Sequence, residues 1–399
     1  PPRPRYLDAV AGLLAAEPTA VQPLLVSWFD DGRPLPTTPH ATVADAAQAL
    51  LHTHRHRAPD DLAETLADSP HPRAGELLAA LAEDEPSALC RAVDRWAHDE
   101  RPARRAAAAA HAPLAASHVR TEADRELLRR AALALLARSA DSALHGAALD
   151  VLVRDPRTRA RHLPRALAHF TAADPRPAPA AVATALATHP DPVLAAFRVR
   201  LSRPDAGHLL AVLADAAPPD LARRVAALAR EAVRQRPGTA EDLAAHVGRR
   251  LDHGPARAVL FPLVTGLLDG GTAALRAALA RVLAAPGTPA SRARRRELLD
   301  FLLAHERAPD VLGALLEAAA RRPDGGTGDL VRHTGLLLGR TTDGAARFDR
   351  ALAALAREVP GFATRLADWR TATPHAWSAL MGPRTRRTIE DLAGVHVPA

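Results

Sequence analysis

The stretch RRRELLDFLLAHERAPDVLGALL, residues 294–316, decides the fold class. Its first half carries an apolar stripe with helical spacing, formed by Leu298, Leu299, Leu302 and Leu303. Pro309 and Asp310 then mark a new start, because proline fits the first turn of a helix and aspartate favours its positive end. The second half repeats the stripe with Val311, Leu312, Leu315 and Leu316. Two amphipathic helices joined by a short link are therefore predicted.

The same pattern recurs through the chain, and strict apolar–polar alternation is absent. Most of the 35 prolines fall between apolar stripes, and further Pro-Asp pairs begin at Pro59, Pro204 and Pro219. Asp155-Pro156 and Asp191-Pro192 recur at a spacing typical of helix-pair repeats, which run to about 34–47 residues. The TPR and ankyrin signatures are absent. We predict an all-α fold: an α-solenoid of antiparallel, HEAT-like helix pairs with about twenty helices.

The composition excludes several kinds of chemistry. The sequence has no lysine and no asparagine, so all 52 basic residues are arginine. This bias indicates a codon pool poor in A and T, and hence a high-GC bacterium as the source. Walker A loops, pyridoxal phosphate sites and S-x-x-K acylases need lysine, and a Cys-His-Asn triad needs asparagine. We expect no enzyme activity and no cofactor.

Cysteine and hydropathy bear on the compartment. Cys90 is the one cysteine, so an intrachain disulfide and a cysteine-based zinc site are excluded, and cytoplasmic residence is expected. The most apolar run, residues 258–268, is shorter than the roughly 18 residues that a membrane span needs. We expect no membrane partner. Because the sequence starts with Pro1-Pro2, we expect it to be part of a longer protein.

Charge is unevenly distributed along the chain. Residues 1–100 carry a net charge of −8, and residues 101–165 carry +7. We therefore predict an acidic helical N-terminal subdomain over residues 1–100 and a basic HEAT-like array over residues 101–399. The alternative is ordinary variation between solvated helix faces. Within the first part, the glycine and prolines of residues 30–39 predict a loop, with helix resuming near Thr42.

On its helix-pair layout the chain resembles the HEAT-like α-solenoid superfamily over nearly its whole length. Residues 258–268, 294–316 and 357–369 also resemble an uncharacterised helical region of actinobacterial multidomain proteins, some of which have a trypsin-like peptidase domain elsewhere. No G-D-S-G stretch occurs in this sequence, so the resemblance implies no catalytic residue here. It implies a helical region that serves a larger protein.

Three motifs could carry chemistry, and each has a simpler structural explanation. His52 and His56 have metal-ligand spacing on a helix, but Arg55 and Arg57 would repel a cation, which favours a solvated helix end. Cys90 lies on an apolar stripe with Leu89, Val93 and Trp96, which favours a core residue over a nucleophile. The turn at residues 324–329 is glycine-rich but follows a helix. It is predicted to be a connection with Thr327 or Asp329 as N-cap.

Arginine runs are the best candidate binding sites, since guanidinium groups bind carboxylate and phosphate. The candidates for an anionic partner are Arg154, Arg157, Arg159, Arg161, Arg165, Arg292, Arg294, Arg295 and Arg296. We predict a non-catalytic protein-interaction scaffold, or a helical regulatory region, that binds a protein partner or a neighbouring domain of the same polypeptide. The alternative is a nucleic-acid-binding solenoid, although interleaved aromatic residues and a recognised module are absent.

Overall fold

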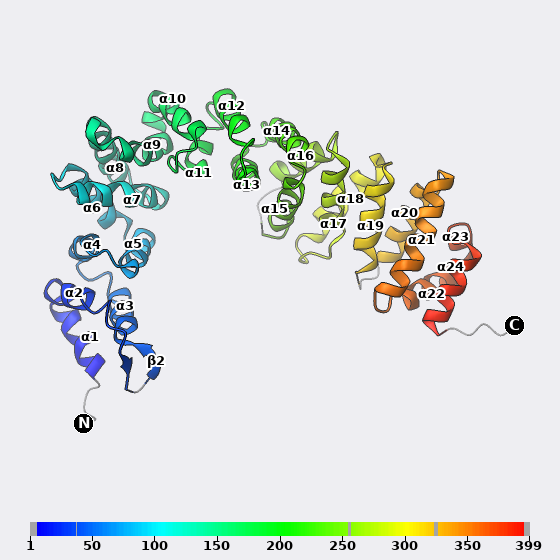
Figure 1. Cartoon of the computed structure of the whole chain (residues 1–399), viewed down its shortest axis with the longest axis horizontal. Helices are drawn as coiled ribbons and strands as arrows, with labels where there is room; N and C mark the ends of the chain where they lie inside the picture. The colour runs from blue at the N-terminus through cyan, green and yellow to red at the C-terminus, as the bar shows by residue number, and fades with distance from the viewer. Residues whose placement is uncertain (1–5, 37, 254–256, 323–325, 395–399) are drawn as a thin grey trace. The chain divides into compact units, whose positions relative to one another are not determined.

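The computed structural model describes residues 6–36, 38–253, 257–322 and 326–394 (Figure 1). These residues form 24 α-helices, one 3₁₀ helix and one two-stranded ribbon. The predicted all-α, solenoid-like fold is confirmed. The chain divides into two compact units, Pro1–His189 and Pro190–Ala399.

The first unit contains eleven α-helices, with the ribbon and the 3₁₀ helix between them. Its elements are α1 (Tyr6–Ala16), α2 (Pro18–Val26), β1 (Pro34–Leu35), β2 (Thr38–Thr42), α3 (Val43–Thr53), α4 (Pro59–Ala67), α5 (Pro72–Asp84), α6 (Pro86–His98), α7 (Pro102–His118), α8 (Glu122–Ala137), η1 (Ser139–Leu144), α9 (His145–Arg154), α10 (Pro156–Ala172) and α11 (Pro179–Ala183).

Helices of the first unit alternate between two layers, so from α2 to α7 each helix packs on the helix two places further along. One layer holds α2, α4, α6 and α8, and the other holds α3, α5, α7 and α9. The predicted subdomain boundary at residue 100 falls between α6 and α7. These two helices pack on each other inside this unit. Such stacking is the arrangement expected of helix-pair repeats.

The N-terminal loop contains regular structure that the sequence did not indicate. β1 and β2 pair antiparallel with an irregular register over part of the region predicted as loop. The helix resumes where it was predicted, because Thr42 caps α3 by accepting a hydrogen bond from the Asp45 amide. The Asp45 carboxylate in turn accepts from the Thr42 amide at 2.8 Å, which completes a capping box.

The second unit repeats the two-layer arrangement. Its helices are α12 (Pro190–Arg200), α13 (Ala206–Ala216), α14 (Ala222–Gln235), α15 (Thr239–His253), α16 (Arg257–Leu268), α17 (Ala273–Ala284), α18 (Arg292–His305), α19 (Pro309–Ala320), α20 (Thr327–Leu338), α21 (Thr342–Glu358), α22 (Phe362–Ala372), α23 (Pro374–Ser378) and α24 (Pro383–Ala393). One layer holds α12, α14, α16 and α18, and the other holds α13, α15, α17, α19 and α21.

Helix starts follow the proline signals closely in some places and loosely in others. α4 and α19 begin at Pro59 and Pro309 as predicted, whereas α13 begins two residues after Pro204 and α14 three residues after Pro219. At the turn before α20, residues 324 and 325 lie outside the described residues. The N-cap of α20 is Gly326, so the predicted caps Thr327 and Asp329 lie inside the helix instead.

The core is built mainly from alanine and leucine, with a few large anchors. The largest fully buried side chains include Trp96, Trp377, Phe170 and Phe197. Trp369 stacks on Trp377 with a centroid distance of 5.9 Å and an interplanar angle of 16°. Each anchor fills volume that alanine-rich helices leave open. Among the described residues, no helix has both the length and the apolar character to cross a bilayer.

Candidate functional site

A surface hollow of the first unit, which we call the α8–α10 groove, has a volume of about 410 Å³. It lies beside the end of α7, the first half of α8, the end of α9 and the start of α10. Its lining residues are Ala116, Val119, Glu122, Arg125, Leu128, Arg129, Val151, Leu152, Arg154, Asp155, Pro156 and Arg157. Apolar side chains thus form the floor, and arginines with two acids form the rim.

Two helix caps fix the walls of the groove. Thr121 caps α8 by accepting a hydrogen bond from the Asp124 amide at 3.1 Å. Asp155 caps α10 by accepting from the Arg157 amide at 2.9 Å. Pro156 follows as the first residue of α10, where its missing N–H costs no hydrogen bond. The two helices therefore begin at fixed positions on either side of the floor.

Ion pairs connect the two walls. Arg129 Nε of α8 lies 2.7 Å from Asp155, and both side chains are mostly buried. Arg157 of α10 lies 2.7 Å from Glu122 of α8, and Arg125 also binds Glu122 at 2.9 Å. Hydrogen bonds from Arg125, then Arg129, lower the pKa of Glu122. The rim is therefore held in place by contacts that are charged at neutral pH.

The lining of the groove has the chemistry of a binding surface. None of its residues is a serine, cysteine, histidine, lysine or tyrosine, and its two acids, Glu122 and Asp155, are both paired with arginines. Ala116, Val119 and Pro156 offer accessible apolar surface above the buried Leu128, Val151 and Leu152. Arg125 and Arg157 remain 41% and 64% exposed, so each can bind a carboxylate beside it.

The first predicted arginine run does not form one patch. Arg154 and Arg157 line the groove, but Arg154 also pairs with the fully buried Asp150 at 2.8 Å. Arg159 turns inward and donates to the carbonyls of Val153 and Arg154. Arg161 is exposed away from the groove, and Arg165 contacts His145. The helical turn of α10 separates residues that are adjacent in sequence, because each step rotates the side chain by about 100°.

The second predicted run divides in the same way. Arg295 is 5% exposed and pairs with Asp252 at 2.9 Å. Arg294 donates to the carbonyl of Leu251 at 2.8 Å. Arg292 and Arg296 are exposed at a separate hollow of the second unit. The α18 start packs against the end of α15, so half of this run stabilises the fold instead of facing a partner.

Arginine–carboxylate pairs between successive repeats are a general feature of both units. Examples separated by 31 to 37 residues are Arg91–Asp60, Arg95–Glu64, Arg130–Asp94, Arg224–Asp191, Arg250–Asp215 and Arg347–Asp310. These separations match one helix pair, so each bridge joins a helix to the equivalent helix of the next pair. Many arginines of this chain therefore hold neighbouring repeats together.

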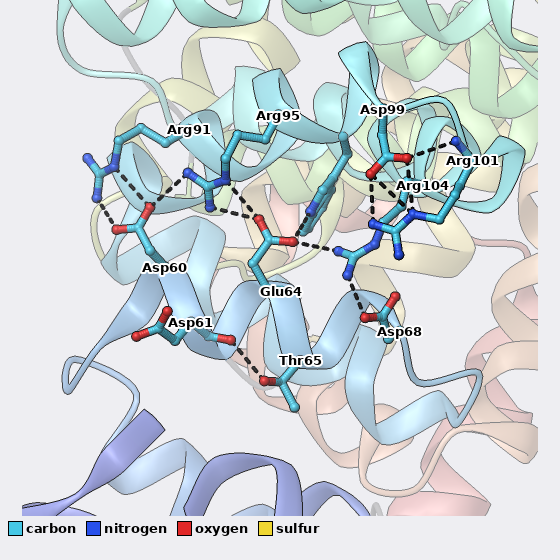
Figure 2. A network of polar contacts seen from close by, with 11 residues as sticks. Asp60, Asp61, Glu64, Thr65, Asp68, Arg91, Arg95, Asp99, Arg101 and Arg104 are labelled. Atoms are coloured by element: carbon cyan, nitrogen blue, oxygen red, sulfur yellow. Dashed lines mark hydrogen bonds and ion pairs between the residues drawn. The ribbon is translucent and has the colours of Figure 1, made fainter. Parts of the chain in front are cut away.

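Figure 2 shows one of these networks, in which acids of α4 face arginines of α6 and α7. Glu64 lies at its centre and accepts hydrogen bonds from Trp96 Nε1 at 2.8 Å and from Arg104 at 2.6 Å. Arg104 is only 6% exposed and also pairs with Asp68. Part of the acidic charge of residues 1–100 is therefore neutralised within the first unit.

The other candidate motifs have structural roles. Cys90 is fully buried, and desolvation raises the pKa of its thiol to about 12, which is the opposite of an activated nucleophile. Arg55 lies between His52 and Asp84 and donates to the Asp84 carboxylate at 2.6 Å. Within the described ranges, no group of three or more histidine, cysteine or acidic side chains could hold a metal ion.

Comparisons with known proteins leave the family open. No protein-family model matches this sequence, and no curated protein is significantly similar to it. One similar solved structure comes from work on a phosphorylation switch that controls the interaction between cadherin and β-catenin. It shares 10% sequence identity over 94% of this chain and 81% of that chain, with a TM-score of 0.23. A TM-score of this size supports no conclusion about fold or function.

Arg125 and Arg129 are groove residues that sequence reasoning missed. They lie in a periodic helix and not in a dense basic run. A usable signal was present, since Glu122 precedes them by three and seven residues and so shares their helix face. Neither the groove floor nor the link to Asp155 could be read from the α8 sequence alone.

Proposed function

We propose that this chain is a non-catalytic helical-repeat scaffold that binds a protein partner, or a neighbouring domain of the same polypeptide, in the α8–α10 groove. The observation that carries the proposal is the apolar floor bordered by the partly exposed Arg125 and Arg157. The bound segment would place an apolar side chain on the floor and a carboxylate beside an arginine. A helical region of a larger bacterial protein fits this role.

The compartment is part of the same proposal. The single cysteine of the sequence, Cys90, suits a reducing cytoplasm. Nothing in the proposed binding mode requires a cofactor or an oxidising environment.

Nucleic-acid binding is less well supported. Sequence-independent binding to single strands combines a basic groove with aromatic side chains on which bases stack. The groove lining has no aromatic residue on which a base could stack. A protein segment with one or two acids is therefore favoured over a polyphosphate chain.

Selection from a random dodecapeptide phage library tests the proposal. The wild-type chain should enrich peptides that combine an apolar residue with aspartate or glutamate. Ala116→Trp places an indole in the groove and should weaken the enriched peptides by roughly tenfold or more, about 1.4 kcal/mol. Ala110→Trp, at an exposed position of the same helix outside the lining, is the matched control.

A second variant protects the test against misfolding. Arg157→Glu changes a rim side chain that is 64% exposed and removes its solvent-exposed pair with Glu122, so it should weaken acidic peptides with only a small shift of the circular dichroism melt. Peptides that bind Ala116→Trp and Arg157→Glu as tightly as wild type would contradict the proposed site. Tighter, strongly salt-dependent binding to a mixed-sequence oligonucleotide would support the nucleic-acid alternative instead.

A further inference from the structure

The second unit has a groove of its own between α12 and α14, with a volume of about 570 Å³. The two helices pack on each other within one layer (Figure 1). The lining residues are Asp191, Leu194, Ala195, Arg198, Arg224, Ala227, Leu228, Arg230, Glu231 and Arg234. We call this hollow the α12–α14 groove. All of its residues belong to the second unit, so it is separate from the α8–α10 groove.

Helical spacing explains why these side chains share one surface. On α12 they lie at Asp191 and at positions three, four and seven residues further on. On α14 most of them follow the same spacing from Arg224 to Glu231, and Arg234 lies three residues beyond. Val225, Ala229 and Val233 lie on the opposite side of α14 and are buried in the core. The groove is therefore a regular, two-helix surface with an apolar floor and charged edges.

The charges of this groove do not balance. Asp191 pairs with Arg224 at 2.5 Å, and Glu231 pairs with Arg198 at 3.1 Å. These two pairs use both acids of the lining. Among the described residues, no carboxylate lies within ion-pair distance of Arg230 or Arg234, although both line the same groove. The groove therefore carries two positive charges in excess.

The guanidinium of Arg230 lies beside the turn that follows α16. Its Nε is buried and has no hydrogen-bond partner among the described residues. Its Nη1 lies over Gly270, at 3.0 Å from the position that a Cβ would occupy there. Gly270 has a φ of +77°, in the region that favours glycine, so the turn after α16 leaves room for the guanidinium. A positioned cation that lacks its counter-ion is suited to receive one from a partner.

We propose that the α12–α14 groove binds an acidic segment of a partner protein, with carboxylates on Arg230 and Arg234 and an apolar side chain on the exposed Ala195 and Ala227, which lie beside the buried Leu194 and Leu228. Charge complementarity selects an acidic partner. The apolar floor and the absence of aromatic residues from the lining favour a peptide over a nucleic acid. This site extends the scaffold to a second interaction surface, and it does not depend on the α8–α10 groove.

Fluorescence anisotropy with defined probes tests the site on the full chain. The probes are three labelled 14-residue peptides of equal length, built from glutamate and leucine, glutamate and serine, or arginine and leucine, and a mixed-sequence 14-nucleotide single-stranded DNA. The glutamate–leucine peptide should bind most tightly at low salt. Arg234→Glu should weaken it by roughly tenfold or more, because it replaces an attraction with a repulsion.

Matched variants separate a local site from a general charge effect. Arg249→Glu changes the net charge by the same amount at an exposed position of α15 outside the groove, and should leave the affinity within about twofold. Ala195→Trp blocks the exposed part of the floor and should also abolish binding. Ala116→Trp in the other groove should have no effect, so failure of one site is distinguishable from failure of the other.

Three results would overturn the proposal. The first is an equal loss of affinity in Arg249→Glu and Arg234→Glu, which would show a net-charge effect. The second is equal binding of the glutamate–serine and glutamate–leucine peptides, which would remove the floor from the site. The third is preferential, Arg234-dependent binding of the single-stranded DNA, which would assign the groove to nucleic acid.

Discussion

The carboxylate of Asp155 lies 2.7 Å from Nε of Arg129, so the residue that caps α10 is also the ion-pair partner of α8. Both side chains are mostly buried, with exposed fractions of 9% and 11%. One carboxylate thus sets where a helix begins and how that helix is attached to its neighbour. In an array of short helices, such shared contacts determine how stacked pairs align.

Asp155→Ala should destabilise the first unit by about 2 kcal/mol, because it removes an N-cap and the acceptor of the buried Arg129 Nε, while the Nη atoms of Arg129 keep Glu122 and Glu126. The measurement is urea unfolding followed by circular dichroism. Asp310→Ala is the control, since its pair with Arg347 is exposed on both sides and should cost less than about 1 kcal/mol. Equal losses in the two variants would show that the Asp155 contact has no special role.

Glu64→Ala should cost about 2 kcal/mol, because it leaves the Trp96 indole N–H and the buried Arg104 without one of their acceptors. Asp61→Ala on the same helix removes only an exposed contact with Thr19 and serves as the control. Urea unfolding monitored by tryptophan fluorescence measures both. A Glu64→Ala variant as stable as Asp61→Ala would mean that water replaces the carboxylate in the network of Figure 2.

The helical class could be predicted because apolar periodicity is a local property, and the stripes of residues 294–316 became α18 and α19 as expected. Binding residues could not be predicted in the same way. Arg294, Arg295 and Arg296 are adjacent in sequence, yet the first bonds a carbonyl, the second is buried on Asp252 and the third is exposed. Which arginine faces solvent depends on which α18 side chains reach the end of α15, and those bonds join distant segments.

The unpaired arginines of the second unit illustrate the same limit. Arg230 and Arg234 lie in an ordinary amphipathic helix without a dense basic run. Only the structure shows that Asp191 and Glu231 bind other arginines and leave these two without an acid. To find the acid that pairs with a given arginine, a search of the sequence would have to know the length of one helix pair. In this chain the paired arginine and acid are separated by 31 to 37 residues.

The Cys90 thiol should react with Ellman's reagent only as fast as the first unit opens, because it is fully buried and its pKa is raised to about 12. An unfolded thiol titrates near pH 8.5. The unfolded state therefore loses a proton above that pH while the folded state keeps it, and the free energy of unfolding should fall as the pH rises above about 8.5. Cys90→Ala removes this dependence and is the control. Rapid labelling of the native protein at pH 7 would contradict the buried, neutral thiol.

The capping box of α3 should lose its effect in acid. The Thr42 amide and hydroxyl, with Arg73, lower the pKa of Asp45 to about 2. An unfolded aspartate titrates near pH 3.9. The pKa of Asp45 is lower in the folded state, so the stability from Asp45 is present above about pH 4 and is lost as the pH falls towards 2.

The measurement is the difference in urea unfolding free energy between wild type and Asp45→Asn at several pH values. It should be constant from pH 7 to 5 and shrink below pH 4, whereas Asp30→Asn, at a nearly fully exposed carboxylate, should show little difference at any pH. A difference between wild type and Asp45→Asn that persists unchanged to pH 2 would contradict the prediction. It would show that the contribution of Asp45 to stability does not depend on its negative charge.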